Sequence, residues 1–308
     1  MRWYKLESPN FPYIPGDLCT DATIWFNDDN KKPEWIEFPP KFTEIHVRRN
    51  KKTLLIIVGE SWTYGENLPG IGTAIKQYNL DSQLSHGIGS RMAVMLDADL
   101  YQYAVPGNCN MYMFSELERM LAYVSTLDYE KVYISIQMTE PGREKGVIND
   151  VQGIGHPLRD LYNSGKQYEM KDWLLSYDQI FFDIYQKTLE KFDLNIDAIL
   201  WKNFCRIVTP RRDYKFKIIE TSWIQYSGNI LNKKLEMPSF YSVGWFADLQ
   251  ETYKIEIDIE WANKQLDMIT KSNEFIKNNP LHNNHLNAQG HLLWAQYLCR
   301  LAGWRDDI

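Results

Sequence analysis

The chain has 308 residues, of which 44% are hydrophobic and 24% are charged, and it carries a formal net charge of −6 at pH 7. This length and composition fit one large globular domain, and the acidic balance argues against a nucleic-acid-binding surface, which should be basic. No apolar run is long enough to cross a bilayer, the first residues do not form a secretory signal, and the four cysteines form no C-x-x-C pair. We therefore expect a cytoplasmic protein with no membrane partner, no disulfide framework and no cysteine zinc site.

Residues 1–50 are rich in aromatic side chains and are interrupted by six prolines, so no long helix fits there. Residues 42–47 roughly alternate apolar and polar side chains, which predicts an edge strand or a hairpin arm. We predict that residues 1–50 are a lead-in packed on a domain formed by residues 51–308. Insertions in that domain are expected near 141–190 and 224–256.

Residues 54–58 (LLIIV) form a short apolar run that is cut by Gly59 and a polar turn. Such a run is typical of a strand that is buried on both faces of a parallel sheet. Ser61 follows at the carboxyl end of this strand, where open α/β sheets bind their ligands. Ser61 is therefore a candidate nucleophile, and the structural alternative is a turn serine that caps the next helix.

The rest of the chain alternates predicted strands with predicted helices. The strands are expected at 100–105, 131–137, 196–201 and 216–223. The helices are expected at 90–96, 110–127, 170–192, 257–277 and from 287. Asn108 or Asn110 is suited to cap the helix at 110–127. This alternation predicts an α/β three-layer sandwich with a central parallel sheet and helices on both faces. The strands at 54–58, 100–105 and 131–137 should run parallel in that sheet. The glycines complete no phosphate-binding motif, so no cofactor is expected.

The segment after the first central strand, Gly59–Gly65 (GESWTYG), cannot be a nucleophile elbow, because Thr63 stands where G-x-S-x-G needs its second glycine. It resembles instead the first block of the SGNH (GDSL-like) hydrolases, Gly-Asp-Ser-x-Thr-x-Gly, with Glu60 in place of the family's Asp. Residues 106–108 (PGN) resemble the second block, and residues 285–290 (HLNAQG) resemble the last. These blocks follow the family's order across nearly the whole chain, so the resemblance implies an SGNH/flavodoxin-like fold.

Two blocks depart from the family pattern. The third block ends in Gly-x-Asn-Asp, whereas this chain has residues 137–140 (QMTE) at the end of the third strand. The TEP turn that begins at Thr139 is similar to that of some divergent members, including phage-encoded ones. Alternatively, Glu140 and Arg143 form a local ion pair that holds a loop. In the last block, His282 stands where the family usually has Asp, three residues before His285.

The resemblance implies a serine esterase or deacetylase that acts on a small-molecule or glycan ester. Ser61 would attack with an exposed hydroxyl, and His285 would act as the base. Backbone N–H groups of Ser61 and Gly107 would bind the oxyanion, with Thr139 or Asn108 as a third donor. His282, Glu140 and Arg143 are accessory candidates.

Two alternatives stay open at this point. Three histidines (His282, His285 and His291) lie within ten residues, but their spacing matches no metal motif, so we expect no metal and expect His291 to face solvent. The second alternative keeps the fold without the chemistry, as a binding, virion or assembly protein. It is favoured by the altered third and last blocks and by the aromatic-rich segments.

Overall fold

The computed structural model describes residues 3–5, 23–26, 44–66, 68, 71, 80–139, 171–202, 213–219, 286 and 288–305. Its strands are β1 (Trp3–Lys5), β2 (Thr23–Phe26), β3 (Glu44–Arg48), β4 (Thr53–Gly59), β5 (Asp99–Ala104), β6 (Lys131–Met138), β7 (Ile196–Lys202) and β8 (Phe216–Ile219). Its helices are α1 (Ser61–Tyr64), α2 (Leu80–His86), α3 (Ile88–Met95), α4 (Asn110–Val124), α7 (Lys171–Glu190) and α12 (Ala288–Ala302). Among the described residues, no helix is both long and apolar enough to cross a membrane.

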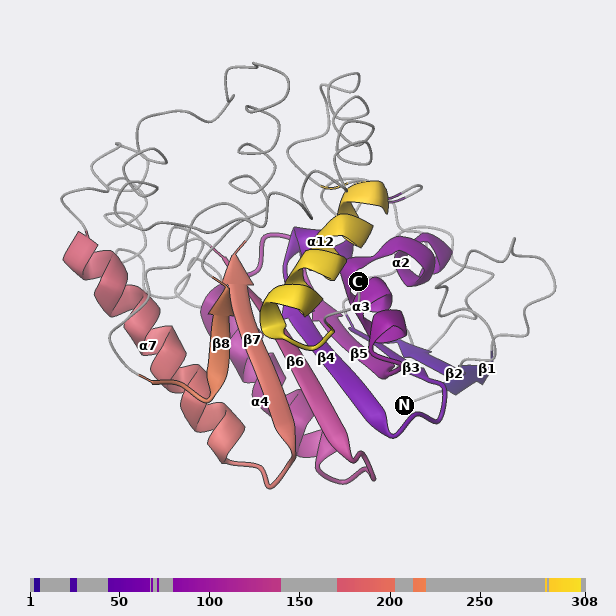
Figure 1. The fold of residues 1–308 in the computed structure, drawn as a ribbon, viewed down its shortest axis with the longest axis horizontal. Helices are drawn as coiled ribbons and strands as arrows, with labels where there is room; N and C mark the ends of the chain where they lie inside the picture. The colour runs from indigo at the N-terminus through magenta and orange to yellow at the C-terminus, as the bar shows by residue number, and fades with distance from the viewer. Residues whose placement is uncertain are drawn as a thin grey trace, which may run out of the picture.

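All eight strands belong to one sheet with the order β1-β2-β3-β5-β4-β6-β7-β8 (Figure 1). The strands from β5 to β8 are parallel, and β1, β2 and β3 extend the sheet antiparallel beyond β5. Numbered along the chain, the five parallel strands have the order 2-1-3-4-5, which is that of flavodoxin-like folds. The predicted α/β sandwich with a central parallel sheet is confirmed.

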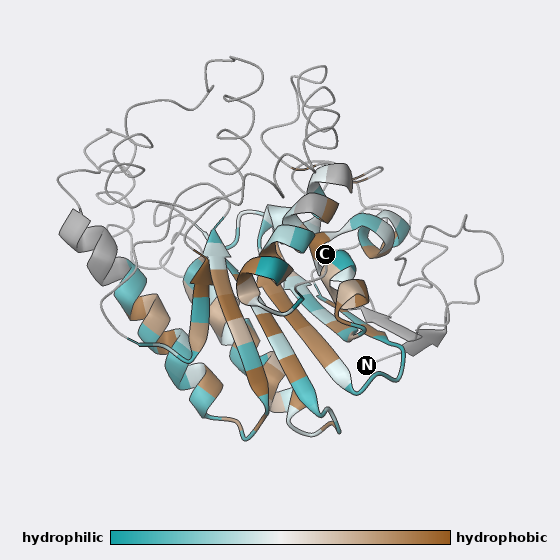
Figure 2. Cartoon of the chain, viewed as in Figure 1, coloured by the Kyte–Doolittle hydropathy of each residue, from teal (hydrophilic) through white to brown (hydrophobic). Residues whose placement is uncertain are grey.

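The sheet is buried on both faces because its central strands are apolar almost throughout. Residues 54–58 of β4 are fully buried. Alternate side chains of a strand point to opposite faces, and here they enter two separate core clusters. Leu54, Ile56 and Val58 pack in the cluster that includes residues of α4 and α7, whereas Leu55 and Ile57 pack with residues of α2, α3 and α12. Figure 2 shows these hydrophobic central strands between the helical layers.

The parallel arrangement predicted for strands at 54–58, 100–105 and 131–137 is confirmed, with bounds that shift by one residue. The strand expected at 42–47 is β3, which is an inner strand between β2 and β5 and not an edge strand. Its antiparallel pairing with β2 fits the hairpin-arm alternative. The helix expected at 257–277 lies outside the described residues. The domain limits and insertions stay predictions.

Candidate active site

The strand order of the sheet reverses around β4. From β4 the chain passes through α2 and α3 on one face to β5, and then through α4 on the other face to β6, which lies on the opposite side of β4 (Figure 1). Ligands of open α/β sheets bind at such a switch point, outside the carboxyl ends of the strands. In register, Gly59 lies beside Ala104, and Val58 beside Ile136. The residues that follow β4, β5 and β6 therefore meet at one edge, which we call the carboxyl edge.

Ser61 is the first residue of the short helix α1, two residues past the end of β4. The backbone N–H of Tyr64 donates to the carbonyl oxygen of Glu60 at 2.7 Å, and Gly65 ends the turn in the left-handed conformation, with φ of 84°. Glu60 is the N-cap residue, so Ser61 does not cap this helix. The expectation of an exposed hydroxyl is wrong: Ser61 is only 4% exposed, and the other three residues of α1 are fully buried.

Gln137, at the end of β6, ties the Ser61 turn to the neighbouring strand. Its Oε1 accepts from the hydroxyl of Thr63 at 2.7 Å, from the backbone N–H of Thr63 at 3.3 Å and from the backbone N–H of Glu60 at 3.4 Å. Its Nε2 donates to Oε1 of Glu60 at 3.1 Å. Gln137, Glu60 and Thr63 are all fully buried. One side chain thus holds the residue before Ser61 and the residue two positions after it, and sequence analysis missed this side chain.

The loop between β5 and α4 brings the predicted oxyanion residues to the same edge. Gly107 has φ of 73°, which favours glycine. Asn108 is 9% exposed, and its Oδ1 accepts from the backbone N–H of Cys109 at 2.9 Å. The Nδ2 of Asn108 is buried and has no hydrogen-bond partner among the described residues. A buried amide N–H without an acceptor lowers the stability of the fold, so this N–H is a candidate to donate a hydrogen bond to a ligand oxygen.

Asn110 joins this loop to the end of β6. Its Oδ1 accepts from the backbone N–H of Thr139 at 2.8 Å, and its Nδ2 donates to the carbonyl oxygen of Thr139 at 3.1 Å. The expectation that Asn108 or Asn110 caps α4 is wrong, because the N-cap residue is Cys109 and no side chain caps the helix. Asn110 instead holds the fully buried Thr139 beside the start of α4.

The last helix supplies one histidine to the described structure. His291 is fully buried, and its Nδ1 accepts the backbone N–H of Ile88 at 3.1 Å, which leaves the ring proton of a neutral imidazole on Nε2. The expectation that it faces solvent is therefore wrong, because its acceptor nitrogen completes the start of α3. His282, His285, Glu140 and Arg143 lie outside the described residues, so their roles and the absence of a metal stay predictions.

The residues next to His285 in the chain lie close to the Ser61 turn. Leu286 is buried in the core cluster that includes Trp62. Ala288 packs against the small cluster of Tyr64, Leu68, Ile71 and Ala104, which joins the α1 turn to the end of β5. The chain that follows His285 is thus anchored at the carboxyl edge.

A buried ion pair lies further along the carboxyl edge. Lys202 ends β7 beside Met138, and its Nζ is 3.1 Å from Oδ1 of Asp178 on α7. The two side chains are 4% and 1% exposed. Because the charges compensate each other, this pair adds no net charge to the edge.

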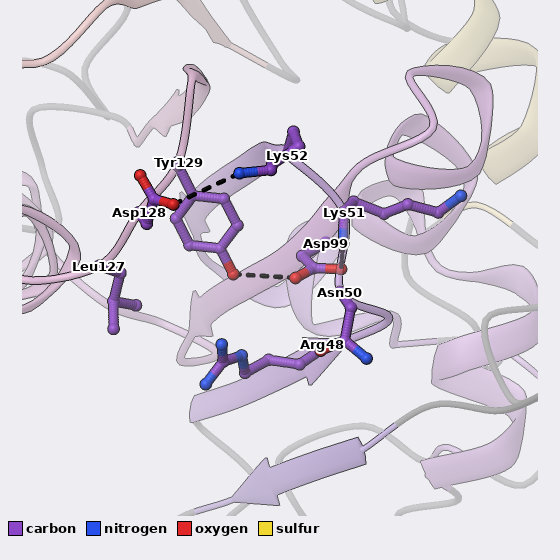
Figure 3. Close-up of a pocket in the computed structure, with 8 residues that line it drawn as sticks. All are labelled: Arg48, Asn50, Lys51, Lys52, Asp99, Leu127, Asp128 and Tyr129. Atoms are coloured by element: carbon purple, nitrogen blue, oxygen red, sulfur yellow. Dashed lines mark hydrogen bonds and ion pairs between the residues drawn. The ribbon is translucent and has the colours of Figure 1, made fainter.

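A cavity of about 210 Å³ lies at the opposite edge of the sheet (Figure 3). Its lining includes Lys52 just before β4, Asp99 at the start of β5 and Tyr129 just before β6. The carboxylate of Asp99 accepts from the backbone N–H of Arg49 at 2.7 Å, from that of Lys51 at 3.2 Å and from the hydroxyl of Tyr129 at 2.9 Å. We call this the amino edge. Its polar groups tie loops together, and none of the predicted site residues lies there.

No family model matches the chain, and no curated protein matches it significantly. Among solved structures, the crystal structure of a "putative GDSL-like lipase" from Parabacteroides merdae matches 83% of this chain and 97% of that chain, at 12% identity and a TM-score of 0.31. At this level of similarity the match carries no weight for function. The fold assignment rests on the strand order and helix layers described above.

Proposed function

We propose that this protein is a serine hydrolase of the SGNH type that cleaves an acyl ester with Ser61 as the nucleophile. The observation that supports the proposal is that the parallel strands β4 and β5 end side by side, so that Ser61 and the Gly107–Asn108 loop follow at the same edge of the sheet. The buried Nδ2 of Asn108 has no partner among the described residues. A nucleophile and a ready oxyanion donor at one ligand-binding edge are the two parts that acyl transfer needs first.

In the proposed reaction, the hydroxyl oxygen of Ser61 attacks the ester carbonyl while His285 takes its proton. The tetrahedral intermediate collapses to an acyl-serine as His285 returns that proton to the leaving alcohol, and water then releases the acid by the same two steps. His285 is proposed as the base because Leu286, the next residue, is buried in the core cluster that includes Trp62, and Ala288 packs against the cluster that includes Tyr64.

The oxyanion would be held by the backbone N–H groups of Ser61 and Gly107, with Nδ2 of Asn108 as the third donor. Asn108 is favoured over the Thr139 hydroxyl because its Nδ2 is buried without a partner in the described structure. Removing one such donor typically costs about 2.7–4 kcal/mol of transition-state stabilisation. An Asn after the second strand could thus supply the donor that the family takes from its third block.

The base is proposed to work in a dyad with Ser61. An imidazole that accepts a proton at one nitrogen needs its other N–H held by an acceptor. His282 carries no fixed negative charge and would stabilise an imidazolium poorly, so a backbone carbonyl or a carboxylate from elsewhere should hold His285. Glu140 and Arg143 remain accessory candidates for the loop that follows Thr139.

The substrate is proposed to carry a small acyl group, with acetyl as the first choice, on a small alcohol or a glycan. Ser61 is 4% exposed, so a bulky acyl chain would have to displace packed residues to reach its hydroxyl. The sugar or alcohol part would lie outside that enclosed position. No part of this reaction calls for a cofactor.

Labelling with a small dialkyl fluorophosphonate tests the proposal, since only an activated serine reacts. Mass spectrometry should find the label on Ser61 of the folded protein and not of the heat-denatured protein, together with hydrolysis of p-nitrophenyl acetate. Ser61→Ala should abolish both, and the matched variant Ser125→Ala, at an exposed serine that donates to the carbonyl of Ala122, should change neither. A folded protein with an unlabelled Ser61 and no turnover would overturn the proposal in favour of a binding or assembly role.

A further inference from the structure

We infer that Gln137 is the positioning residue for Ser61, and that it works through a polarised pairing of its amide with the carboxylate of Glu60. The inference rests on the proposed role of Ser61 as a nucleophile. It requires a specific hydrogen bond between the side chains at positions 60 and 137. One of the two must be an amide whose N–H donates, and the other must supply the oxygen that accepts.

The geometry assigns two tasks to one side chain. Oε1 of Gln137 gathers three donors from the turn, namely the N–H of Glu60 and both the N–H and the hydroxyl of Thr63, at 2.7–3.4 Å. Nε2 of Gln137 reaches Oε1 of Glu60 at 3.1 Å. Since Glu60 and Thr63 stand one residue before and two residues after Ser61, these bonds hold the backbone from which the Ser61 side chain and N–H project.

Packing leaves the arrangement little freedom. A Cβ at Gly59 would lie 2.1 Å from the Thr63 hydroxyl oxygen and 2.8 Å from Oε1 of Gln137, so only glycine lets the strand end approach these groups. Gln137 is fully buried, so water cannot replace the amide in the described structure. A shift of the turn by about 1 Å could cost on the order of 100-fold in rate.

The pairing predicts a specific response to charge. Gln137→Glu keeps an acceptor for the three donors of the turn but puts a second carboxyl group against Glu60. Two carboxylates in one buried site cannot both ionise readily, so the pair should hold one proton at low pH and repel at high pH. The exchanged pair Glu60→Gln with Gln137→Glu restores one amide donor and one carboxylate acceptor with their positions reversed.

The experiment measures the rate of fluorophosphonate labelling of Ser61 from pH 5 to 9 for the wild type, both single variants and the double variant, each divided by the wild-type rate at the same pH. We expect Gln137→Glu to label about 100-fold more slowly at pH 8 and to recover toward pH 5. Glu60→Gln should have a small effect, because its amide can still accept from Gln137. The double variant should return to within about threefold of the wild type at pH 8, since one donor and one acceptor again face each other.

Gln102→Glu is the matched control, because Gln102 on β5 is nearly as buried as Gln137 and its Oε1 lies beside Gly89 of α3. It should lower the melting temperature without the pH-dependent loss of labelling. If Gln137→Glu does not fold at pH 8, the rate is measured at pH 5 and in the double variant. Equal labelling of all variants, a pH-independent loss, or a double variant that is not rescued would overturn the inference while the labelled wild type keeps the proposed function. An unlabelled wild type would overturn both.

Discussion

The two edges of the parallel sheet use buried polar groups in different ways. At the amino edge, the carboxylate of Asp99 accepts three hydrogen bonds and thereby ties together the loops before β4 and β6. Figure 3 shows the bond from Tyr129. At the carboxyl edge, Gln137 and Asn110 also tie loops together, but Asn108 beside them has a buried donor with no partner among the described residues. A buried amide donor at the carboxyl ends of parallel strands, where open α/β sheets bind their ligands, is a candidate to contact a ligand. Changes at the carboxyl edge should therefore affect activity, and changes at the amino edge should affect stability.

The largest effect is expected for Ser61→Ala, which should lower p-nitrophenyl acetate turnover by at least about 1,000-fold. The free energy of unfolding should change by less than about 1.5 kcal/mol, because only one hydroxyl is lost from a position that Ala fills. Steady-state kinetics and urea unfolding measure the two quantities. Unfolding of the variant under native conditions would show that Ser61 serves the fold and not the chemistry.

The next largest effect separates the two histidines of the last block. His285→Ala should remove most of the turnover, since the nucleophile loses its base, whereas His282→Ala should cost much less. The comparison is made as kcat for the same ester at pH 8. Equal losses at both positions would contradict the dyad. They would favour either a proton relay through His282 and His285 or a metal site at these histidines.

Asn108→Ala should lower kcat by roughly 100-fold or more, corresponding to about 2.7–4 kcal/mol for one oxyanion donor. KM should change little, because the donor acts on charge that develops in the transition state. Asn195→Ala is a suitable control, since that exposed amide donates to the carbonyl of Glu130 far from the carboxyl edge. A normal kcat in Asn108→Ala would indicate that the Thr139 hydroxyl, and not Asn108, is the third oxyanion donor.

Asp99→Ala tests the other side of the comparison. It leaves two backbone N–H groups and the hydroxyl of Tyr129 without their acceptor, so it should lower the free energy of unfolding by about 2 kcal/mol. Labelling of Ser61 in the folded fraction should stay at the wild-type rate. A loss of labelling without a loss of stability would break the distinction between the edges.

A smaller, pH-dependent effect is expected from His46 on β3. Burial, together with the nearby charge of Arg48, lowers the pKa of His46 from 6.5 to about 3. Between these values the unfolded chain binds a proton that the folded chain does not, so stability should fall as the pH falls from about 6.5 toward 3. The slope from this one group approaches about 1.4 kcal/mol per pH unit.

Urea unfolding of His46→Phe between pH 4 and 6 measures that slope, because Phe keeps a ring against Tyr101, on which His46 stacks at 4.7 Å. The variant should lose less stability than the wild type as the pH falls. Parallel curves for His46→Phe and the wild type would show that His46 is protonated in the fold.

The central sheet could be predicted because its strands carry their signal locally. The run at 54–58 is apolar without interruption, and the amphipathic repeat of α4 is regular, so each element could be recognised alone. The strands β1 and β2 have only three and four residues, too few for a period to appear. Their antiparallel pairing turned the expected edge strand into an inner one.

The site could be predicted only for residues that directly follow a strand recognisable from the sequence. Ser61 and Gly107 follow strands that could be recognised from sequence, so their common edge followed from the parallel order. Gln137 acts on residues 74–77 positions earlier in the chain, and Asn110 acts on Thr139 across 29 positions. No local pattern marks such pairings. The burial of Ser61 also depends on packing from distant segments, which is why its exposure was wrongly predicted.

The bond from Ile88 to His291 spans 203 positions and has a consequence for the order in which the protein matures. During synthesis, the first central strands and α3 leave the ribosome long before α12 exists. Until residue 291 is available, the N–H at the start of α3 lacks its acceptor and the apolar face under α12 lacks its cover. Contacts this distant in sequence form late and slow folding. A nascent chain should therefore form its first central strands early, and the proposed Ser61 site should be complete only after residue 291 has left the ribosome.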